Sequence, residues 1–343
     1  MFRRFQAVLA LAVTVQAGTL YFPPPGEGLD VQSLRTPAQT GFREAVVKQL
    51  EDVAPRWALW RAGHLVHVKG DFNQTQNVAS NRKTWHALTV GAAIQQGKIP
   101  SLDQKLGVWN KELTGKNAQA TWRHVITQSA GFDYPYSDYP AYLPGKMWTY
   151  SDLNPIQLCN ALARAYGKKD YHDHYDEIVR QAYFDAIGMR GWRVGFRKDL
   201  KSGLEDDGIR YFLDLEDMGR LGLLVVARGE WNGRRLIPEW FVKQLETKQT
   251  RGMRVNYNGP NDGAPAGMDA RKFPEVPYGF MTWVNTDGDY FPGADRGWAM
   301  AIGAGGFLTL WNHKYGIVFA AAGAITTPTT RGVPHILEAN LKK

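Results

Sequence analysis

Segments with strand patterns stand near both ends of this chain, and a long stretch with helical and irregular patterns lies between them. Near the start, Trp57–Trp60 and Leu65–Val68 are predicted strands joined by a turn at Ala62-Gly63. Four more predicted strands follow near the end: Tyr278–Asn285, Trp298–Ile302, Phe307–Trp311 and Ile317–Ala322. This order predicts a fold of the α/β (α+β) class, in which both ends of the chain close one central antiparallel sheet that helices flank.

The middle of the chain should supply a second, mostly helical lobe. Helical patterns cover five segments of the whole sequence: Pro37–Val53, Ser80–Gln96, Asn154–Tyr166, Leu213–Ala227 and Pro238–Leu245. We expect one domain over residues 36–343, with a sheet lobe at about 36–79 and 266–343 and a helical lobe at about 80–265. A cleft between two such lobes is a usual place for a small-molecule site.

Residues 1–17 have the features of an export signal. Arg3 and Arg4 form a short positive region, an apolar stretch covers Ala7–Val15, and Val15-Gln16-Ala17 resembles a cleavage site with small residues. The apolar stretch is short for a membrane span, and an uncleaved anchor is the alternative. We therefore expect a periplasmic or secreted bacterial protein. Residues 18–35, which are rich in proline and glycine, should form an extended lead-in to the domain.

The net charge of the chain is +8, but its basic residues are scattered rather than clustered. Nucleic-acid binding would need a basic stripe with interleaved aromatic residues, so we expect no nucleic-acid partner and only a weak attraction to an anionic cell envelope. The single cysteine, Cys159, excludes an internal disulfide, and its helical surroundings predict a buried and inert thiol.

A serine and a lysine three positions apart open the predicted helix Ser80–Gln96. Positions i and i+3 share one face of a helix, so the Ser80 hydroxyl and the Lys83 amine should lie side by side. A serine hydroxyl needs a base within hydrogen-bond reach to act as a nucleophile, and a desolvated lysine can be that base. A capping serine followed by a solvated lysine is the ordinary alternative. Two distant segments favour the catalytic interpretation.

The first of these segments, Pro144–Asp152, contains the third candidate catalytic residue, Tyr150. With Ser80 and Lys83, its Pro-Gly-x-x-x-x-Tyr-Ser pattern resembles the serine β-lactamase and D-alanyl-D-alanine peptidase superfamily, specifically the class C β-lactamase-related esterase branch. The resemblance implies a β-lactamase/transpeptidase-like fold and a nucleophilic Ser80 whose proton Lys83 and Tyr150 manage. A phenolate beside an ammonium could take that proton and return it to the leaving group.

The second segment, Gly303-Ala304-Gly305-Gly306, precedes the predicted strand at Phe307 and matches the glycine-rich family motif on a strand beside the site. The resemblance implies an oxyanion hole formed by the N–H of Ser80 and an N–H near Gly306 or Phe307. Gly305 would let the strand approach a substrate closely, whereas an ordinary glycine bulge is the alternative.

Two departures from the family pattern bear on the substrate and on the base. Ala304 stands where the family often has lysine or histidine, which help to read a substrate carboxylate, so we expect ester or amide substrates rather than efficient β-lactam hydrolysis. Asp152 stands where the family usually has asparagine. An ionised carboxylate would favour the ammonium form of Lys83 and would shift the role of base towards Tyr150.

Smaller family marks follow in order, and the resemblance covers roughly residues 41–323: Thr127–Phe132, Ala186–Met189, Trp231-Asn232-Gly233 and Pro238-Glu239-Trp240. A class A Ser-Asp-Asn motif at Ser151-Asp152 is disfavoured because Leu153 breaks it. His172-Asp173-His174 has ligand chemistry, but its polar surroundings favour a solvated surface, so we expect no metal and no other cofactor.

Three functions remain open at this point. The favoured one is an exported serine hydrolase that cleaves a small ester, amide or peptide through an acyl-enzyme on Ser80. The second is a penicillin-binding D-alanyl peptidase or β-lactamase of the cell envelope. The third is a non-catalytic binding protein on the same scaffold, which Ala304 and Asp152 motivate. In each case we expect a monomer.

Overall fold

The computed structural model describes residues 20–25, 33–132, 142–172, 174–198, 205–255, 273, 275–323 and 327–342. The predicted export signal, residues 1–17, lies outside these described residues. Within the described ranges, no helix is both long enough and apolar enough to span a bilayer.

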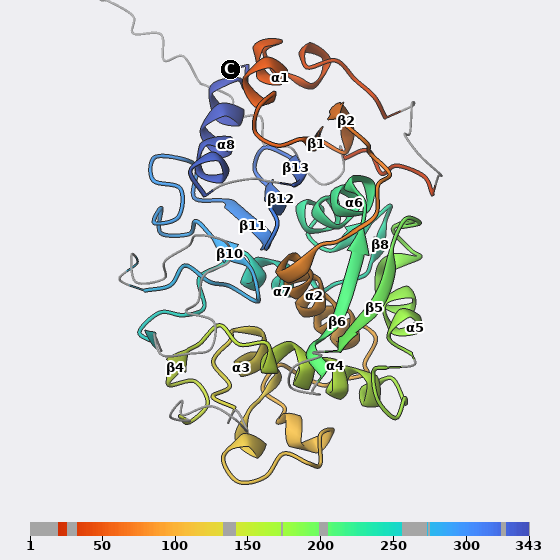
Figure 1. The fold of residues 1–343 in the computed structure, drawn as a ribbon, viewed down its shortest axis with the longest axis vertical. Coiled ribbons are helices and arrows are strands. Elements are labelled where there is room, and N and C mark those ends of the chain that lie inside the picture. Colours follow the sequence, from red (N-terminus) through yellow and green to blue (C-terminus); the bar gives the residue numbers. More distant parts are fainter. Residues whose placement is uncertain are drawn as a thin grey trace, which may run out of the picture.

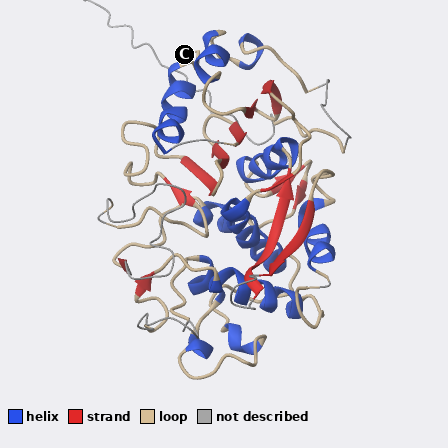
Figure 2. Ribbon diagram, in the orientation of Figure 1, coloured by secondary structure: helices blue, strands red, loops and turns tan. Residues whose placement is uncertain are grey.

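One antiparallel sheet of six strands forms the centre of the molecule (Figure 1; Figure 2). Its strands follow the order β10-β11-β12-β13-β1-β2. Their bounds are Trp283–Val284 (β10), Trp298–Gly303 (β11), Phe307–Asn312 (β12), Ile317–Ala322 (β13), Arg56–Arg61 (β1) and His64–Lys69 (β2). The register pairs Arg56 of β1 with Ala322 of β13. The predicted closure of one antiparallel sheet by segments from both ends of the chain is therefore confirmed.

The predicted strand Tyr278–Asn285 is wrong in its first half, because only Trp283–Val284 forms β10. Met281 has a φ of 47°, in the left-handed region, and a continuous strand cannot include such a residue. A Cβ atom at Gly279 would lie 2.1 Å from the carbonyl oxygen of Leu245, so this segment is pressed against the body of the domain. Regular pairing therefore starts only after the turn.

The two faces of the sheet bury two separate apolar clusters, as the alternation along β1 shows. Trp57 and Leu59 join one cluster, whereas Ala58 and Trp60 join the other. On the Leu59 face lie α1 (Ala45–Leu50) and α8 (Thr327–Ala339), which bury Val46, Leu50, Val333 and Leu337 in that cluster. Helix α8 was not among the helices predicted from the sequence.

Helix α6 (Leu215–Val226) covers the opposite face of the sheet. A Cβ atom at Gly219 would lie 2.4 Å from the Trp60 ring, and one at Gly222 would lie 2.5 Å from Cγ1 of Val318. The two glycines therefore let the helix axis come close to the sheet. Although its residues fall within the predicted helical lobe, α6 packs directly on the sheet.

The other helices of the middle region surround this core, and their bounds are α2 (Arg82–Gln95), α3 (Trp122–Ile126), α4 (Leu153–Ala165), α5 (Tyr175–Val179) and α7 (Glu239–Leu245). Single turns of other helix types are η2 (Ala38–Thr40), η3 (Ala79–Asn81), η4 (Leu106–Val108), η5 (Asn117–Gln119) and the π-helical η6 (Arg180–Phe184). The predicted helix Pro37–Val53 is wrong as one helix. It is divided into η2 and α1 by Gly41, whose φ is 76°, and by Phe42, which bridges to Leu341.

A second sheet runs through the region predicted to be helical and irregular, which is a correction to that prediction. Its strands follow the order β3-β6-β5, with bounds Gln76–Asn77, Glu205–Leu213 and Arg193–Lys198. Two short pairs complete the strands: β4 (Met147–Trp148) with β9 (Arg254–Val255), and β7 (Glu230–Trp231) with β8 (Arg234–Arg235). Ile209, Tyr211 and Leu213 are buried apolar residues at every second position of β6, although Arg210 between them is buried as well.

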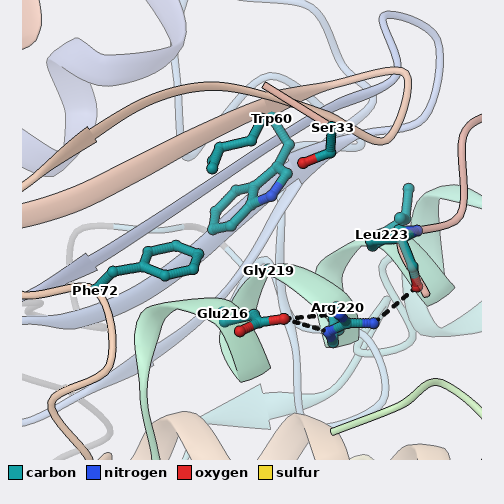
Figure 3. A pocket seen from close by; sticks show the side chains of 9 residues that line it. Ser33, Trp60, Phe72, Glu216, Gly219, Arg220 and Leu223 are labelled. Carbon is teal, nitrogen blue, oxygen red and sulfur yellow. Dashed lines mark hydrogen bonds and ion pairs between the residues drawn. The ribbon is translucent and has the colours of Figure 1, made fainter. Parts of the chain in front are cut away.

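The lead-in segment is not a loose extension where it is described, because residues 20–25 dock on the domain. The backbone N–H of Tyr21 donates to the carbonyl of Ala62 at 2.9 Å, and the Tyr21 ring stacks on His64 at 4.7 Å between centroids. Farther along, Arg220 of α6 donates to the carbonyls of Pro23 and Pro24 at 2.9 and 2.8 Å. Arg220 and Glu216 line a cavity of about 10 Å³, room for about one water molecule, and Figure 3 shows the two side chains next to each other.

Two buried carboxyl groups converge at the start of α6. A Cβ atom at Gly191 would lie 2.0 Å from Oδ2 of Asp214 and 3.2 Å from Oδ2 of Asp217. Asp214 caps the helix by accepting from the N–H of Asp217 at 2.8 Å. Burial and the neighbouring Asp214 raise the pKa of Asp217 well above 3.8. Because two neighbouring carboxylates repel each other, the two groups do not readily ionise together.

We predict that Asp217→Asn stabilises the protein at pH 8. An Asp whose pKa is raised by folding binds a proton in the folded state, so stability falls as pH rises from about 4 to the folded pKa. The loss is about 1.4 kcal/mol for each unit of the rise. An asparagine amide cannot ionise and could donate to Asp214. Thermal unfolding from pH 4 to pH 8 should show a flatter profile for the variant; an unchanged slope would contradict the prediction.

Candidate active site

Ser80 lies in the turn η3, immediately before α2, rather than in the helix itself. The preceding residue, Ala79, has a φ of 49°, and the side chain of Asn77 accepts from its N–H at 2.9 Å. A non-glycine residue in the left-handed region is strained, and such strain gathers at functional sites. The turn presents Ser80 as partly exposed, whereas Asn81, Arg82 and Lys83 after it are buried.

Asn81 fastens this turn to the central sheet. Its side-chain N–H₂ donates to the carbonyl of Ala301 in β11 at 2.9 Å and to the hydroxyl of Thr309 in β12 at 3.3 Å. Its carbonyl oxygen accepts from the indole of Trp85 at 2.7 Å. The side chain is fully buried, so all three bonds form away from water. Asn81 was not predicted from the sequence, because its two partners in the sheet lie more than two hundred positions away.

Lys83 occupies the centre of the site. Its Nζ donates to Ser80 Oγ at 3.1 Å and lies 2.5 Å from Oδ1 of Asp152. The same ammonium lies 4.7 Å from the centroid of the Tyr150 ring, over its face. The Lys83 side chain is 1% exposed. The three residues predicted from the sequence as catalytic, Ser80, Lys83 and Tyr150, are therefore brought together around one buried amine.

Tyr150 meets Lys83 through its ring face and not through its hydroxyl. Within the described part of the chain, that hydroxyl makes no hydrogen bond to a protein group. The ring is held by Trp148 and Tyr278, at centroid distances of 6.2 and 6.5 Å. Burial raises the pKa of Tyr278 well above 10.0, and the nearby Tyr150 and Asp152 raise it further. Tyr278 therefore stays a neutral phenol beside the site.

Gln128, a residue that the sequence analysis did not single out, holds the Tyr150 segment from behind. Its backbone carbonyl accepts from the N–H of Thr149 at 2.9 Å. Its side-chain oxygen accepts from the N–H of Ser151 at 3.0 Å and from the amide of Asn154 at 2.7 Å. Gln128 is fully buried and has a φ of 59°. One strained residue thus fixes the chain on both sides of Tyr150.

The carboxylate of Asp152 lies among cationic side chains. Burial raises its pKa, but Lys83 and then Arg82 lower it, with a further contribution from Arg210 of β6, and the net result is a pKa below the ordinary 3.8. The carboxylate is therefore ionised at neutral pH. The Asp152 carboxylate therefore balances the positive charge of Lys83, which a neutral asparagine at this position would not do.

The predicted glycine segment lies in the turn between β11 and β12, where Gly305 and Gly306 have φ values of 83° and 79°. Gly303, at the end of β11, is the glycine that meets the Ser80 turn: a Cβ atom there would lie 2.1 Å from the Val78 carbonyl and 3.1 Å from the Ser80 nitrogen. Gly305, Gly306 and Phe307 follow directly after it, and their predicted part in the oxyanion hole stays a prediction.

The remaining candidates lie outside this site. Cys159 is fully buried, as predicted, and burial raises the pKa of its thiol to about 12. In the His172-Asp173-His174 segment, His172 and His174 pair with Asp170 and Glu177, and Asp173 lies outside the described residues. Among the described residues, no three His, Cys, Asp or Glu side chains are placed to hold a metal ion.

Two hollows of the structure also lie away from Ser80. One is the small cavity at Arg220. The other has a volume of about 480 Å³ and lies near η6, lined by Pro25, Arg180, Asp185, Gly188, Met189, Arg190 and Trp192. Neither is lined by Ser80, Lys83 or Tyr150.

Comparison with known proteins supports the fold and the family that the sequence predicts. A family model described as Beta-lactamase matches residues 56–339. A candidate beta-lactamase from Bacteroides dorei DSM 17855 has a similar structure, with 15% identity, a TM-score of 0.66, and coverage of 88% of this chain and 98% of that chain. A candidate 6-aminohexanoate-dimer hydrolase from Bacillus anthracis has 14% identity, a TM-score of 0.63, and coverage of 86% and 80%.

A third solved structure, EstCE1, is described as a hydrolase with promiscuous acyltransferase activity. It has 14% identity, a TM-score of 0.60, and coverage of 91% of this chain and 99% of that chain. No curated protein matches the sequence. Identities this low show the fold alone, and they confirm the predicted β-lactamase/transpeptidase-like architecture. Because the family model spans most of the chain, the protein belongs to the beta-lactamase family, whose members are serine hydrolases acting on small molecules.

Proposed function

We propose that this protein is a serine hydrolase that cleaves a small ester or amide through an acyl-enzyme on Ser80. The observation that carries the proposal is the 3.1 Å hydrogen bond between Lys83 Nζ and Ser80 Oγ inside a buried, ordered site. A general base must lie within hydrogen-bond reach of the proton it takes, and Lys83 meets that condition. Ser80, in a strained turn before a helix, has the exposure that a nucleophile needs.

The proposed acylation starts from the neutral amine of Lys83. Ser80 Oγ bonds to the substrate carbonyl carbon while its proton passes to Lys83 Nζ and the carbonyl electron pair moves to oxygen. The N–H of Ser80 and one from the Gly303–Phe307 turn would hold that oxyanion. Collapse of the intermediate expels the leaving group, which takes a proton from the Lys83 and Tyr150 pair. Water then releases the acid from Ser80 by the same steps.

Ester or amide substrates fit the site better than β-lactams. Recognition of a substrate carboxylate in this family is expected to use a cation in the glycine segment, and Ala304 cannot supply one. The similar structures include a candidate hydrolase of a 6-aminohexanoate dimer and the hydrolase EstCE1. We extend the proposal to an exported, periplasmic or secreted enzyme that acts as a monomer. The charged N-terminus and the following apolar stretch support the export part of it.

The test is the change Ser80→Ala, which should abolish both p-nitrophenyl ester hydrolysis and labelling by a fluorophosphonate probe. Removal of a nucleophile in such a site typically lowers the rate by about 10⁴-fold or more. Intact-mass measurement of the wild type should show one adduct, located on Ser80. Ser101→Ala, at an exposed position outside the site, is the matched control and should keep full activity.

Full ester hydrolysis by the Ser80→Ala variant would reject the mechanism. Absence of any fluorophosphonate or penicillin adduct on the wild type would favour a non-catalytic binding protein. A long-lived penicillin adduct on Ser80, with slow ester turnover, would favour the D-alanyl peptidase alternative.

A further inference from the structure

The contacts of Lys83 favour its ammonium form, whereas a general base must be a neutral amine. Its ammonium has three neighbours: the Ser80 hydroxyl at 3.1 Å, the Asp152 carboxylate at 2.5 Å and the Tyr150 ring at 4.7 Å. Both the carboxylate and the ring face attract a cation, and both interact more strongly with an ammonium than with a neutral amine. With the side chain 1% exposed, water weakens these attractions little.

The charged groups around the pair do not cancel this preference. Arg82 of α2 and Arg210 of β6 join Lys83 in keeping Asp152 ionised. Tyr278, which senses both Tyr150 and Asp152, stays neutral because burial raises its pKa. His86, one turn along α2, is also neutral, because burial and then Arg82 and Lys83 lower its pKa well below 6.5. Asp152 is thus the anion that faces Lys83 among these described groups.

We propose that Asp152 is a positioning residue that locks Lys83 as a hydrogen-bonding ammonium in the resting enzyme and thereby restricts acylation of Ser80 to alkaline conditions. The inference rests on the proposed function and adds a regulation of that site. To begin acylation, the Lys83–Asp152 pair must first release one Lys83 proton to water, after which the amine takes the Ser80 proton. An asparagine at position 152 could still accept from Lys83 but would carry no charge to oppose that release.

The test is the pH dependence of fluorophosphonate labelling on the full chain, measured as a second-order rate constant from pH 5 to pH 10. Asp152→Asn should move the midpoint of the rise downward by about one to three pH units, the shift that one close opposite charge produces. At pH 6 to 7 the variant should therefore label at least about ten times faster than the wild type. Asp152→Ser, which also removes the charge, should move the midpoint in the same direction.

Matched control and folding measurements keep the outcome clear. Asp103→Asn removes an exposed carboxylate that pairs with Arg123, outside the site, and should leave the profile unchanged. Thermal unfolding confirms that each variant is folded. A midpoint that stays or rises in both folded variants would overturn the inference, and so would loss of labelling at every pH, which would make Asp152 a proton acceptor. A wild type with no adduct on Ser80 at any pH would instead defeat the proposed function itself.

Discussion

Gly303→Ala is expected to lower acylation of Ser80 by about 100-fold or more while the domain stays folded, the scale of loss that a 1 Å misplacement of a reacting group can cause. The methyl group would lie 2.1 Å from the Val78 carbonyl oxygen and 2.9 Å from the Asn81 nitrogen, distances that no Cβ atom tolerates. Both contacts are backbone atoms of the nucleophile turn, so no flexible side chain can move aside. Either the turn or the end of β11 must shift.

The shift would act on the nucleophile because Asn81 also holds the turn to the strand pair that contains Gly303. Asn81 ties η3 to Ala301 and Thr309, two positions on the same pair of strands. Pushing the turn away from Gly303 therefore stretches these bonds and moves Ser80 Oγ relative to Lys83 Nζ. The Gly303 contact is thus a steric requirement of the site and not of the sheet alone.

Labelling rates with a fluorophosphonate probe measure the effect, and thermal unfolding shows whether the sheet survives. Gly332→Ala is the matched control, since a Cβ atom at that position of α8 meets nothing within 4 Å. The control should label like the wild type and be slightly more stable, because alanine favours a helix. Wild-type labelling by a folded Gly303→Ala variant would show that β11 does not press on the nucleophile turn.

Local patterns in the sequence are sufficient for most strands of the central sheet and for the neighbouring pair Ser80 and Lys83. Short continuous apolar runs predict β1 and β13, and the Ser80 to Lys83 spacing predicts a shared face, since both depend on neighbours along the chain. Tyr150 could be placed only through the family resemblance. The contact of its ring face with the Lys83 ammonium depends on the packing of Trp148 and Tyr278 around it.

The supporting residues escape prediction because their partners are distant. Gln128 looks like an ordinary polar residue until the chain folds and brings the N–H of Ser151 to its side-chain oxygen. The sequence does not distinguish Gly303 from Gly305 and Gly306, because only the folded structure shows which glycine contacts Val78. The same holds for residues 20–25, whose proline run predicts an extended conformation but not the surface on which it docks.

That docked segment leads to the largest expected loss of stability, from Arg220→Ala. The guanidinium is 2% exposed and donates to Glu216 at 2.7 Å, to the carbonyls of Pro23 and Ile187 at 2.9 Å each, and to that of Pro24 at 2.8 Å. Truncation leaves three carbonyl groups and one carboxylate without these donors. Removing one partner of a buried ion pair costs about 3–5 kcal/mol, a large part of the 5–15 kcal/mol that ordinarily stabilises a domain.

The measurement is the free energy of unfolding in urea. Lys243→Ala, which removes an exposed ion pair with Glu239, is the matched control and should change stability by less than about 0.5 kcal/mol. Arg220→Lys should fall between the two, because an ammonium keeps the charge but cannot reach four acceptors at once. A loss below about 1 kcal/mol for Arg220→Ala would mean that water replaces the guanidinium at the carbonyls.

A chain that begins at Gly26 separates the docking role of Arg220 from its role inside the domain. Without Pro23 and Pro24, the guanidinium keeps Glu216 and Ile187 but loses two of its acceptors. Arg220→Ala should therefore cost less in the shortened chain than in the full chain, since changes that remove the same contacts are not additive. Equal costs in both chains would place the stabilisation wholly within α6 and the Ile187 turn. A smaller cost would show that Arg220 stabilises the domain by holding residues 20–25 in place.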